Sequence, residues 1–405
     1  MILLTRVIVS MTIVCCGQVA EDTKCGTDAL ADDPECIRER GPNSTIGLFT
    51  AAGFGGRGHT ARKSLVAEHG GTAESEAAVD RALSWLAAVQ LPDGGWSFDH
   101  RAGPPNPARK APDPGNLEVA RNAATAMAVL PFLGAGCTHV DGPYRDTVER
   151  ALAYLTANIT EDGSLREQGG TMYSHALAAI ALGEAYGMTE DGQLRAPAQA
   201  ALNFIADAQD PVGGGWRYTR RQPGDMSVSG WQLMALKTGH MASLQVPPNT
   251  IAKAVEFLDS VSTENGAFYG YTSPAKRSSL TAVGLLCRMH LGWTQDHESL
   301  NAGVQYLADL GPRPRDMYYN FHVTGLMRQI GGEHWTNWNA QMRDHLVQIQ
   351  VKEGPGKGSW HVGVEHAGWA PDLEGIVNRR GGRLGNTALA TMILQAYYRD
   401  LPIRR

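Results

Sequence analysis

The sequence predicts an all-α fold, an α/α toroid in which six helix pairs form an inner and an outer ring. Three observations support this prediction. Amphipathic helical segments alternate six times with more apolar, alanine-rich segments between about residues 74 and 400. A glycine-rich turn recurs between the two members of a pair. Successive turns lie about 50 residues apart, which is the length of two helices and two turns.

The first member of each pair is amphipathic, with apolar residues at helical spacing such as Val79, Leu83 and Leu86. We expect these helices to bury one face and to form the outer ring. The predicted ranges are Glu74–Gln90, Tyr144–Asn158, Leu194–Gln209, Asn249–Val261, Leu300–Leu310 and Trp338–Gln350.

The second member of each pair is apolar over more of its surface, so we expect burial on two sides and a place in the inner ring. Small residues such as Ala178 and Ala179 permit close helix packing. The predicted ranges are Glu118–Leu133, Tyr173–Gly187, Val228–Ser243, Leu280–Leu291, Phe321–Ile330 and Asn386–Arg399.

The turns within the pairs share a pattern of glutamine, glycine and tryptophan. Gln90–Trp96 reads QLPDGGW, Gln209–Trp216 reads QDPVGGGW, and Gln350 precedes Gly358–Trp360, which reads GSW. Glycine accepts the left-handed conformation that ends a helix. We expect the tryptophan to pack back over the turn and the glutamine to bond a helix end. Weaker copies end at Leu165 and Phe268, and a degenerate one at Tyr318.

Composition excludes several classes of protein. The 405 residues are 43% hydrophobic, which is enough for a large core, and no run approaches the ~18 apolar residues of a spanning helix. A net charge of -5 gives no electrostatic support for nucleic-acid binding. Six cysteines are too few for a disulfide scaffold of this length.

The N-terminal region divides into two parts ahead of a single toroid domain at 53–405. Residues 1–20 join Arg6 to a short apolar stretch and resemble a weak secretory signal, the alternative being a plain extension. Residues 21–52 are polar and acidic, which predicts a flexible linker. If the chain is exported to a periplasm, Cys25 and Cys36 can pair; in a cytoplasm they stay free thiols. The sequence leaves both locations open.

The Gln…Gly-x-Trp turns resemble the QW repeats of squalene and oxidosqualene cyclases. The region from about residue 53 to 399 is similar to the prenyltransferase/squalene-oxidase repeat proteins of the terpenoid cyclase and protein prenyltransferase superfamily. Further segments carry the resemblance: Gly224–Lys237, Tyr173–Thr189 and Gly381–Ala390. It implies the toroid fold, whereas repeats alone do not imply a reaction.

The catalytic motifs of those families are missing from the sequence. No Asp-x-Asp-Asp run like that of the squalene–hopene cyclases is present. We find no Asp-x-Cys pair followed by a suitably placed histidine, as in zinc-binding prenyltransferases. Cys25–Asp28 reads CGTD and does not match the thioester motif of related toroids. We therefore predict neither a metal nor a cofactor.

Parallel inner helices bring their six N-termini together at one end of the ring, which we call the mouth. Helix N-termini carry partial positive charge and free N–H groups, so we expect a polar or anionic ligand there. The candidate residues at the turns and helix starts are Tyr173, His175, Arg217, Tyr218, Asp225, Ser227, Trp231, Tyr271, Tyr318, Tyr319, Asn320, His322 and Asn386.

Three of these are candidates for catalysis. Asp225 precedes an inner helix where a cyclase-like acid would stand, but an aspartate there also serves as an N-cap. His175 and His322 lie near the starts of their helices and suit a base, or a hydrogen-bonded structural role. The remaining candidates for ligand binding are Tyr173, Arg217, Tyr218, Trp231, Tyr319, Asn320 and Asn386.

Three further motifs have competing interpretations. His361–His366 reads HVGVEH and misses the spacing of a helical zinc motif by one residue, so a loop is favoured. Gly53–Gly58 reads GFGGRG, but no alternating strands and helices follow, which favours a turn over a dinucleotide site. The arginines of 217–221 are either an anion site or a solvated turn.

Two functions of different classes fit these observations. One is an enzyme with cyclase-, transferase- or lyase-type activity on an unidentified small molecule, lipid or glycan in a polar central cavity. The other is a non-catalytic repeat domain that binds a protein, lipid or glycan. A deep pocket with a buried Asp225 favours the enzyme, and a cavity filled by Met226, Trp231 and Met234 favours the scaffold.

Overall fold

The computed structural model describes residues 53–399 and 401–402, except 168–170 and 362–373. The predicted signal and linker at 1–52 lie outside these residues. Within the described part, no helix is long and apolar enough to cross a membrane. Helices dominate the architecture, which confirms the all-α prediction.

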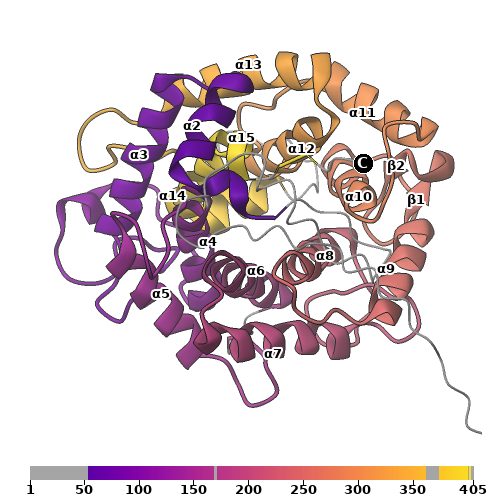
Figure 1. The fold of residues 1–405 in the computed structure, drawn as a ribbon, viewed down its shortest axis with the longest axis horizontal. Helices are drawn as coiled ribbons and strands as arrows, with labels where there is room; N and C mark the ends of the chain where they lie inside the picture. Colours follow the sequence, from indigo (N-terminus) through magenta and orange to yellow (C-terminus); the bar gives the residue numbers. More distant parts are fainter. Residues whose placement is uncertain (1–52, 168–170, 362–373, 400, 403–405) are drawn as a thin grey trace, which may run out of the picture.

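Six helices form the outer ring, each burying one face (Figure 1). In α9, for example, Ile251, Ala254 and Leu258 are buried at helical spacing. The outer helices are α3 (Ala73–Ala88), α5 (Arg145–Ala157), α7 (Gly192–Ala208), α9 (Pro248–Ser260), α11 (Glu298–Leu310) and α13 (Gly332–Ile349).

Six helices stand inside them, and each packs against its two inner neighbours, with the last against the first. The inner ring is therefore closed. Its helices are buried almost throughout, as their apolar composition predicted. They are α4 (Arg121–Gly134), α6 (Met172–Thr189), α8 (Met226–Met241), α10 (Ser278–His290), α12 (Met317–Ile330) and α14 (Glu374–Leu394).

The tryptophans of the three strongest turns pack onto the ends of the outer helices that precede them. Trp96, Trp216 and Trp360 are fully buried. Each indole N–H donates to a backbone carbonyl near the end of its outer helix. The acceptors are Leu86 for Trp96, Ile205 for Trp216 and Leu346 for Trp360, at 2.8, 2.7 and 2.8 Å.

The glutamines of the same turns join each outer helix to the next. Their side-chain amides donate to carbonyls in the first two turns of the following outer helix: Gln90 to Thr147, Gln209 to Thr250 and Gln350 to Ala78. One glycine in each turn has positive φ (Gly94, Gly214 and Gly358), and a Cβ on it would collide with the backbone of the same neighbouring helix. The bond from Gln350 in the last turn to α3 closes the outer ring.

The C-terminal ends of the inner helices, which we call the base, are covered by both ends of the described chain. The covering elements are η1 (Gly55–Arg57), α2 (His59–Glu68) and α15 (Ala396–Arg399). Glu184 of α6 lies between Arg57 and Arg399, at 2.8 and 2.7 Å from their guanidinium nitrogens. Arg399 also donates to the carbonyl of Leu130 in the last turns of α4.

Three local features differ from the prediction. Helix α2 precedes the first predicted helix. The last inner helix begins at Glu374 and breaks at Gly382, whose φ is 52°, rather than beginning at Asn386. The fourth turn forms a short antiparallel pair, β1 (Ser262–Thr263) and β2 (Phe268–Tyr269), around η3 (Glu264–Gly266). A second 3-10 turn, η2, spans Pro107–Lys110.

Candidate functional site

Carboxylates of the chain itself occupy three of the inner-helix N-termini. Asp225 accepts from Val228 in α8, Asp316 accepts from Tyr319 in α12, and Glu167 accepts from the first N–H groups of α4. These groups already offset the helix dipoles. The expected preference for an anionic ligand therefore loses its physical basis at these three helices.

Asp225 is the N-cap of α8, and its side chain is fully buried. Oδ1 accepts from the Ser227 hydroxyl at 2.6 Å and from the Val228 N–H at 2.9 Å. Oδ2 has no hydrogen-bond partner and lies 3.6 Å from Nε of Arg217. Burial raises the pKa of this carboxyl, and interactions with Ser227, Val228, the Tyr271 hydroxyl and the Arg217 guanidinium oppose the shift. One oxygen thus serves as the cap, while the other faces the Arg217 guanidinium without a hydrogen bond.

A line of hydroxyls leads from α6 to this carboxyl. The Tyr173 hydroxyl lies 2.6 Å from Oγ of Ser227. Because Ser227 donates its proton to Asp225, Tyr173 is the donor to Ser227. Burial raises the pKa of Tyr173, so the phenol stays protonated. The arrangement Tyr173–Ser227–Asp225 forms a continuous path of exchangeable protons.

Tyr218 and Tyr271 form a second polar group beside Asp225. Their hydroxyl oxygens are 2.6 Å apart, and the Arg217 guanidinium lies over both rings, about 5.5 Å from each centroid. Their backbone carbonyls accept from the first N–H groups of α6 and α8. Neighbouring inner helices are thereby held together at the mouth.

Deeper along the axis, aromatic side chains fill the ring. Trp231 of α8 and Phe321 of α12 stack with centroids 5.6 Å apart, although α10 separates their helices in the ring order. His322 packs edge-on against Trp231 and Tyr318, at 5.4 and 4.6 Å. At this level aromatic contacts span the ring.

Several buried polar atoms around this cluster have no hydrogen-bond partner. They are Oδ2 of Asp225, the Tyr318 hydroxyl and both ring nitrogens of His322. Buried polar groups in folded proteins are nearly always paired. Their gathering on the inner helices makes the region from Asp225 to His322 the candidate site.

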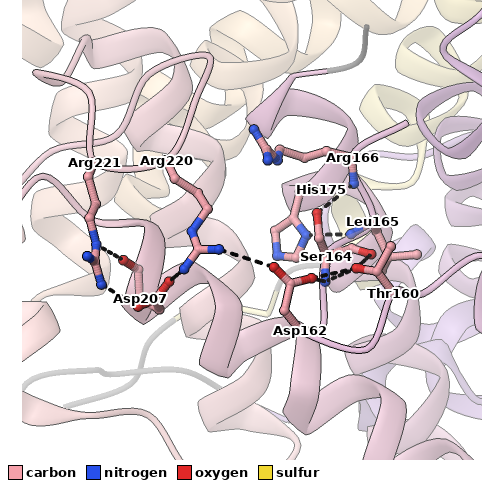
Figure 2. Close-up of polar contacts among 9 residues, drawn as sticks. All are labelled: Thr160, Asp162, Ser164, Leu165, Arg166, His175, Asp207, Arg220 and Arg221. Carbon is pink, nitrogen blue, oxygen red and sulfur yellow. Dashed lines mark hydrogen bonds and ion pairs between the residues drawn. The ribbon is translucent and has the colours of Figure 1, made fainter. Parts of the chain in front are cut away.

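His175 does not face the mouth, contrary to the prediction. Its Nδ1 accepts from the Leu165 N–H and its Nε2 donates to the Ala201 carbonyl of α7, both at 3.0 Å. The ring packs on Phe204 between the two layers of helices. Burial lowers the pKa of His175 to about 4, so it is neutral. Figure 2 shows it beside the Leu165 turn.

Tyr319 also faces outward, and two asparagines are held by backbone groups. The Tyr319 hydroxyl donates to carbonyls at Leu307 and Gly311 of the outer layer. Asn320 binds both backbone groups of Arg313. Asn386 donates to the Gly382 carbonyl. We therefore drop Tyr319 and Asn320 as ligand-binding candidates.

The arginine run at 217–221 is not an open anion site. Arg220 bridges Asp162 and Asp207, and Arg221 binds Asp207 at 2.6 Å (Figure 2). These pairs tie the turn to α7 and to the preceding turn. Arg57 of the GFGGRG segment is likewise paired with Glu184 at the base.

The part of the chain that the structure describes contains no cluster of three or more His, Cys, Asp or Glu side chains that could hold a metal ion. Nε2 of His361, the first residue of the HVGVEH motif, lies 3.6 Å from Oδ1 of Asp113. The rest of this motif falls outside the described residues. Two surface pockets lie on the outside of the molecule, one along α7 and α9 and the other at Val140–Thr147.

Sequence reasoning missed two contributors to the mouth. Glu167 caps α4 from 44 residues downstream of Ala123, a distance that no local motif signals. In the sequence, Phe321 indicated only where an inner helix begins. Its stacking on Trp231, two helices away in the ring, has no sequence signature.

The fold defines the class of protein as an α/α toroid. The sequence matches no protein-family model and no curated protein. Among solved structures, the chain is similar to the GH76A α-1,6-mannanase of Salegentibacter sp. HEL1_6, with a TM-score of 0.54 and 10% identity over 80% of this chain and 98% of that one. It is also similar to the type II terpene cyclase MstE of Scytonema, with a TM-score of 0.52 and 13% identity over 81% and 98%.

Proposed function

We propose that this chain is a toroid enzyme of the cyclase, transferase or lyase type, in which Asp225 is the general acid. The observation that carries the proposal is the buried Asp225 carboxyl, whose Oδ2 is unbonded and whose pKa is raised. A general acid needs to hold its proton near the working pH and to present it to the ligand. Oδ1, occupied by the cap, fixes the orientation of the group.

The hydroxyl path supplies a way to restore the proton. After Asp225 gives its proton to the ligand, Ser227 passes one to Oδ1 and receives one from Tyr173. Arg217 stabilises the carboxylate that exists between these steps, since its Nε lies 3.6 Å from Oδ2. One proton from solvent replaces the proton that Tyr173 gave up, so the net result is the uptake of a single proton by the Asp225 carboxyl.

The compared structures favour this chemistry over glycoside hydrolysis. The solved variants of MstE replace an aspartate, a tyrosine and an arginine, and the same three residue types meet around Asp225. The inactive mannanase variants replace two adjacent aspartates. Residues 53–405 contain no adjacent pair of aspartates. We further propose that the three Gln…Trp turns are QW repeats.

The proposal is tested with a matched pair of helix caps. Asp225→Asn keeps the cap of α8 and removes the acid, while Asp316→Asn makes the same change at the cap of α12. Each protein is incubated with squalene and with geranylgeraniol, and products are separated by gas chromatography and mass spectrometry. We expect wild type and Asp316→Asn to form product and Asp225→Asn to lose at least a hundredfold in rate. Full turnover by Asp225→Asn contradicts the assignment.

One observation favours a second function, a non-catalytic domain that binds a lipid, glycan or protein. Trp231 of α8 stacks on Phe321 of α12 across the intervening α10, and such a contact within the ring is expected of a scaffold. Mass spectrometry of molecules that co-purify with the wild-type chain separates the two functions. A bound molecule that is recovered unchanged after prolonged incubation supports binding without catalysis.

A further inference from the structure

His322 occupies an unusual position for a structural histidine. It lies on α12 with 1% of its surface exposed, surrounded by Trp231, Tyr318 and Phe321. Neither ring nitrogen has a hydrogen-bond partner. Burial lowers the pKa of His322 to about 3, so the imidazole is neutral and offers one N–H donor and one acceptor.

This arrangement is costly for the fold. A buried polar group without a partner costs about 1–3 kcal/mol, and an apolar side chain of similar shape avoids that cost. His175 makes the contrast clear, because both of its nitrogens are bonded to backbone groups of the surrounding layers. The packing of the ring therefore accounts for His175 and does not account for His322.

A second unpartnered donor lies beside it. Tyr318, one turn earlier on α12, is 3% exposed, and its hydroxyl has no partner. The two rings are 4.6 Å apart. Burial raises the pKa of Tyr318, and the Asp225 carboxylate raises it further, so the phenol stays protonated. Two orphaned polar groups thus lie next to each other on α12, in contact with the aromatic stack.

We infer that His322 and Tyr318 bind a neutral hydroxyl or carbonyl group of an otherwise apolar ligand, whose body displaces or lies against the Trp231–Phe321 stack. This inference rests on the proposed function only for the location of the site. The ligand that we infer is a neutral lipid alcohol or ketone. One donor–acceptor pair on His322 and one hydroxyl on Tyr318 match a single such group.

The surroundings disfavour other ligands. A diphosphate needs cations, and the side chains in contact with His322 are aromatic. An ammonium group would meet a neutral imidazole, and the ring contacts of His322 are aromatic. A sugar has a hydroxyl on nearly every carbon, whereas this part of the ring offers few free polar atoms.

The test measures binding rather than turnover. Geranylgeraniol, squalene, geranylgeranyl diphosphate and mannotriose are titrated into the full-length protein, the lipids in a fixed micelle background, by isothermal calorimetry. The variants are His322→Leu and Tyr318→Phe. The matched control is Tyr319→Phe, which removes a hydroxyl from the adjacent residue on the outward face of the same helix.

We expect wild type to bind geranylgeraniol at least tenfold more tightly than the other three probes. Each of His322→Leu and Tyr318→Phe should weaken geranylgeraniol binding about tenfold and leave squalene binding unchanged, while Tyr319→Phe changes neither. The melting temperature of His322→Leu should equal or exceed that of wild type, because the substitution removes an unpaired polar group.

Three outcomes overturn the inference: no measurable binding of geranylgeraniol by wild type, equal affinity in the variants, or tighter binding of the diphosphate or the sugar. Failure of the proposed function is distinguishable. His322-dependent binding without any product retains the ligand class and rejects the enzyme. Turnover that depends on Asp225, with the same ligand selectivity in His322→Leu and Tyr318→Phe as in wild type, retains the enzyme and rejects the ligand class.

Discussion

At the base of the inner ring, Glu184 is bonded to Arg57 and Arg399, and Arg399 also satisfies a helix carbonyl. At the mouth, Asp225 has one oxygen without a partner and a single arginine 3.6 Å away. Both carboxylates are buried on inner helices. The difference separates two environments of a buried charge, since Glu184 is hydrogen-bonded by two arginines through both oxygens, whereas Asp225 has an oxygen with a longer ion pair and no hydrogen bond.

Glu184→Leu should produce the largest effect at the base. The substitution leaves two buried arginines facing each other without a counter-ion, which typically costs roughly 3–5 kcal/mol. Urea unfolding followed by circular dichroism measures the loss. A cost below about 1 kcal/mol would show that the chain ends at the base close the ring without this cluster.

Acid should destabilise the fold through His175. Its pKa is lowered from 6.5 to about 4 in the folded chain, so stability is complete above pH 6.5 and falls as the pH drops toward 4. At about 1.4 kcal/mol per pH unit, the loss is about 3 kcal/mol. His175→Phe should remove the part of the acid dependence due to His175 and leave the part due to His322, whose pKa is lowered to about 3. The substitution costs roughly 1–3 kcal/mol at pH 7 for the unpaired Leu165 N–H. An unchanged acid slope in the variant contradicts the assignment.

Asp225 should show the smallest effect on stability and the opposite sign. Because its folded pKa is raised, its contribution is most favourable below the ordinary aspartate value and is lost as the pH rises through the raised value. Asp225→Asn removes that dependence and keeps the cap, so the stability difference arising from capping stays within about 0.5 kcal/mol. Unfolding midpoints between pH 3 and 8 provide the measurement.

The helix order and the ring were predictable because each pair repeats the same pattern of one-sided and all-round apolar helices. The turns were predictable because the same residue types repeat in the sequence. Gln90 and Trp96 make the same bonds in their turn that Gln209 and Trp216 make in theirs. Helix α2 was missed because its apolar periodicity is weak, with only Ala61 and Val66 buried.

The sequence could not predict whether an individual site residue points toward the ring axis or toward the outer ring, for a physical reason. An inner helix is apolar around its whole circumference, so its sequence does not distinguish the side toward the axis from the side toward the outer ring. Tyr318 and Tyr319 are neighbours in sequence and point to opposite sides. His175 and His322 look alike in sequence, yet only His322 reaches the axis.

The bond from Gln350 to Ala78 has a consequence for the evolution of this architecture. In an open solenoid, repeats can be added or removed at either end, and the end repeats need polar caps. Here every pair has two neighbours, so a seventh pair has no place to dock and a lost pair leaves two unmatched faces. The number of repeats is therefore locked by geometry, whereas the position of the chain ends is not. Circular permutants opened between α6 and α7 keep every bond that joins one outer helix to the next.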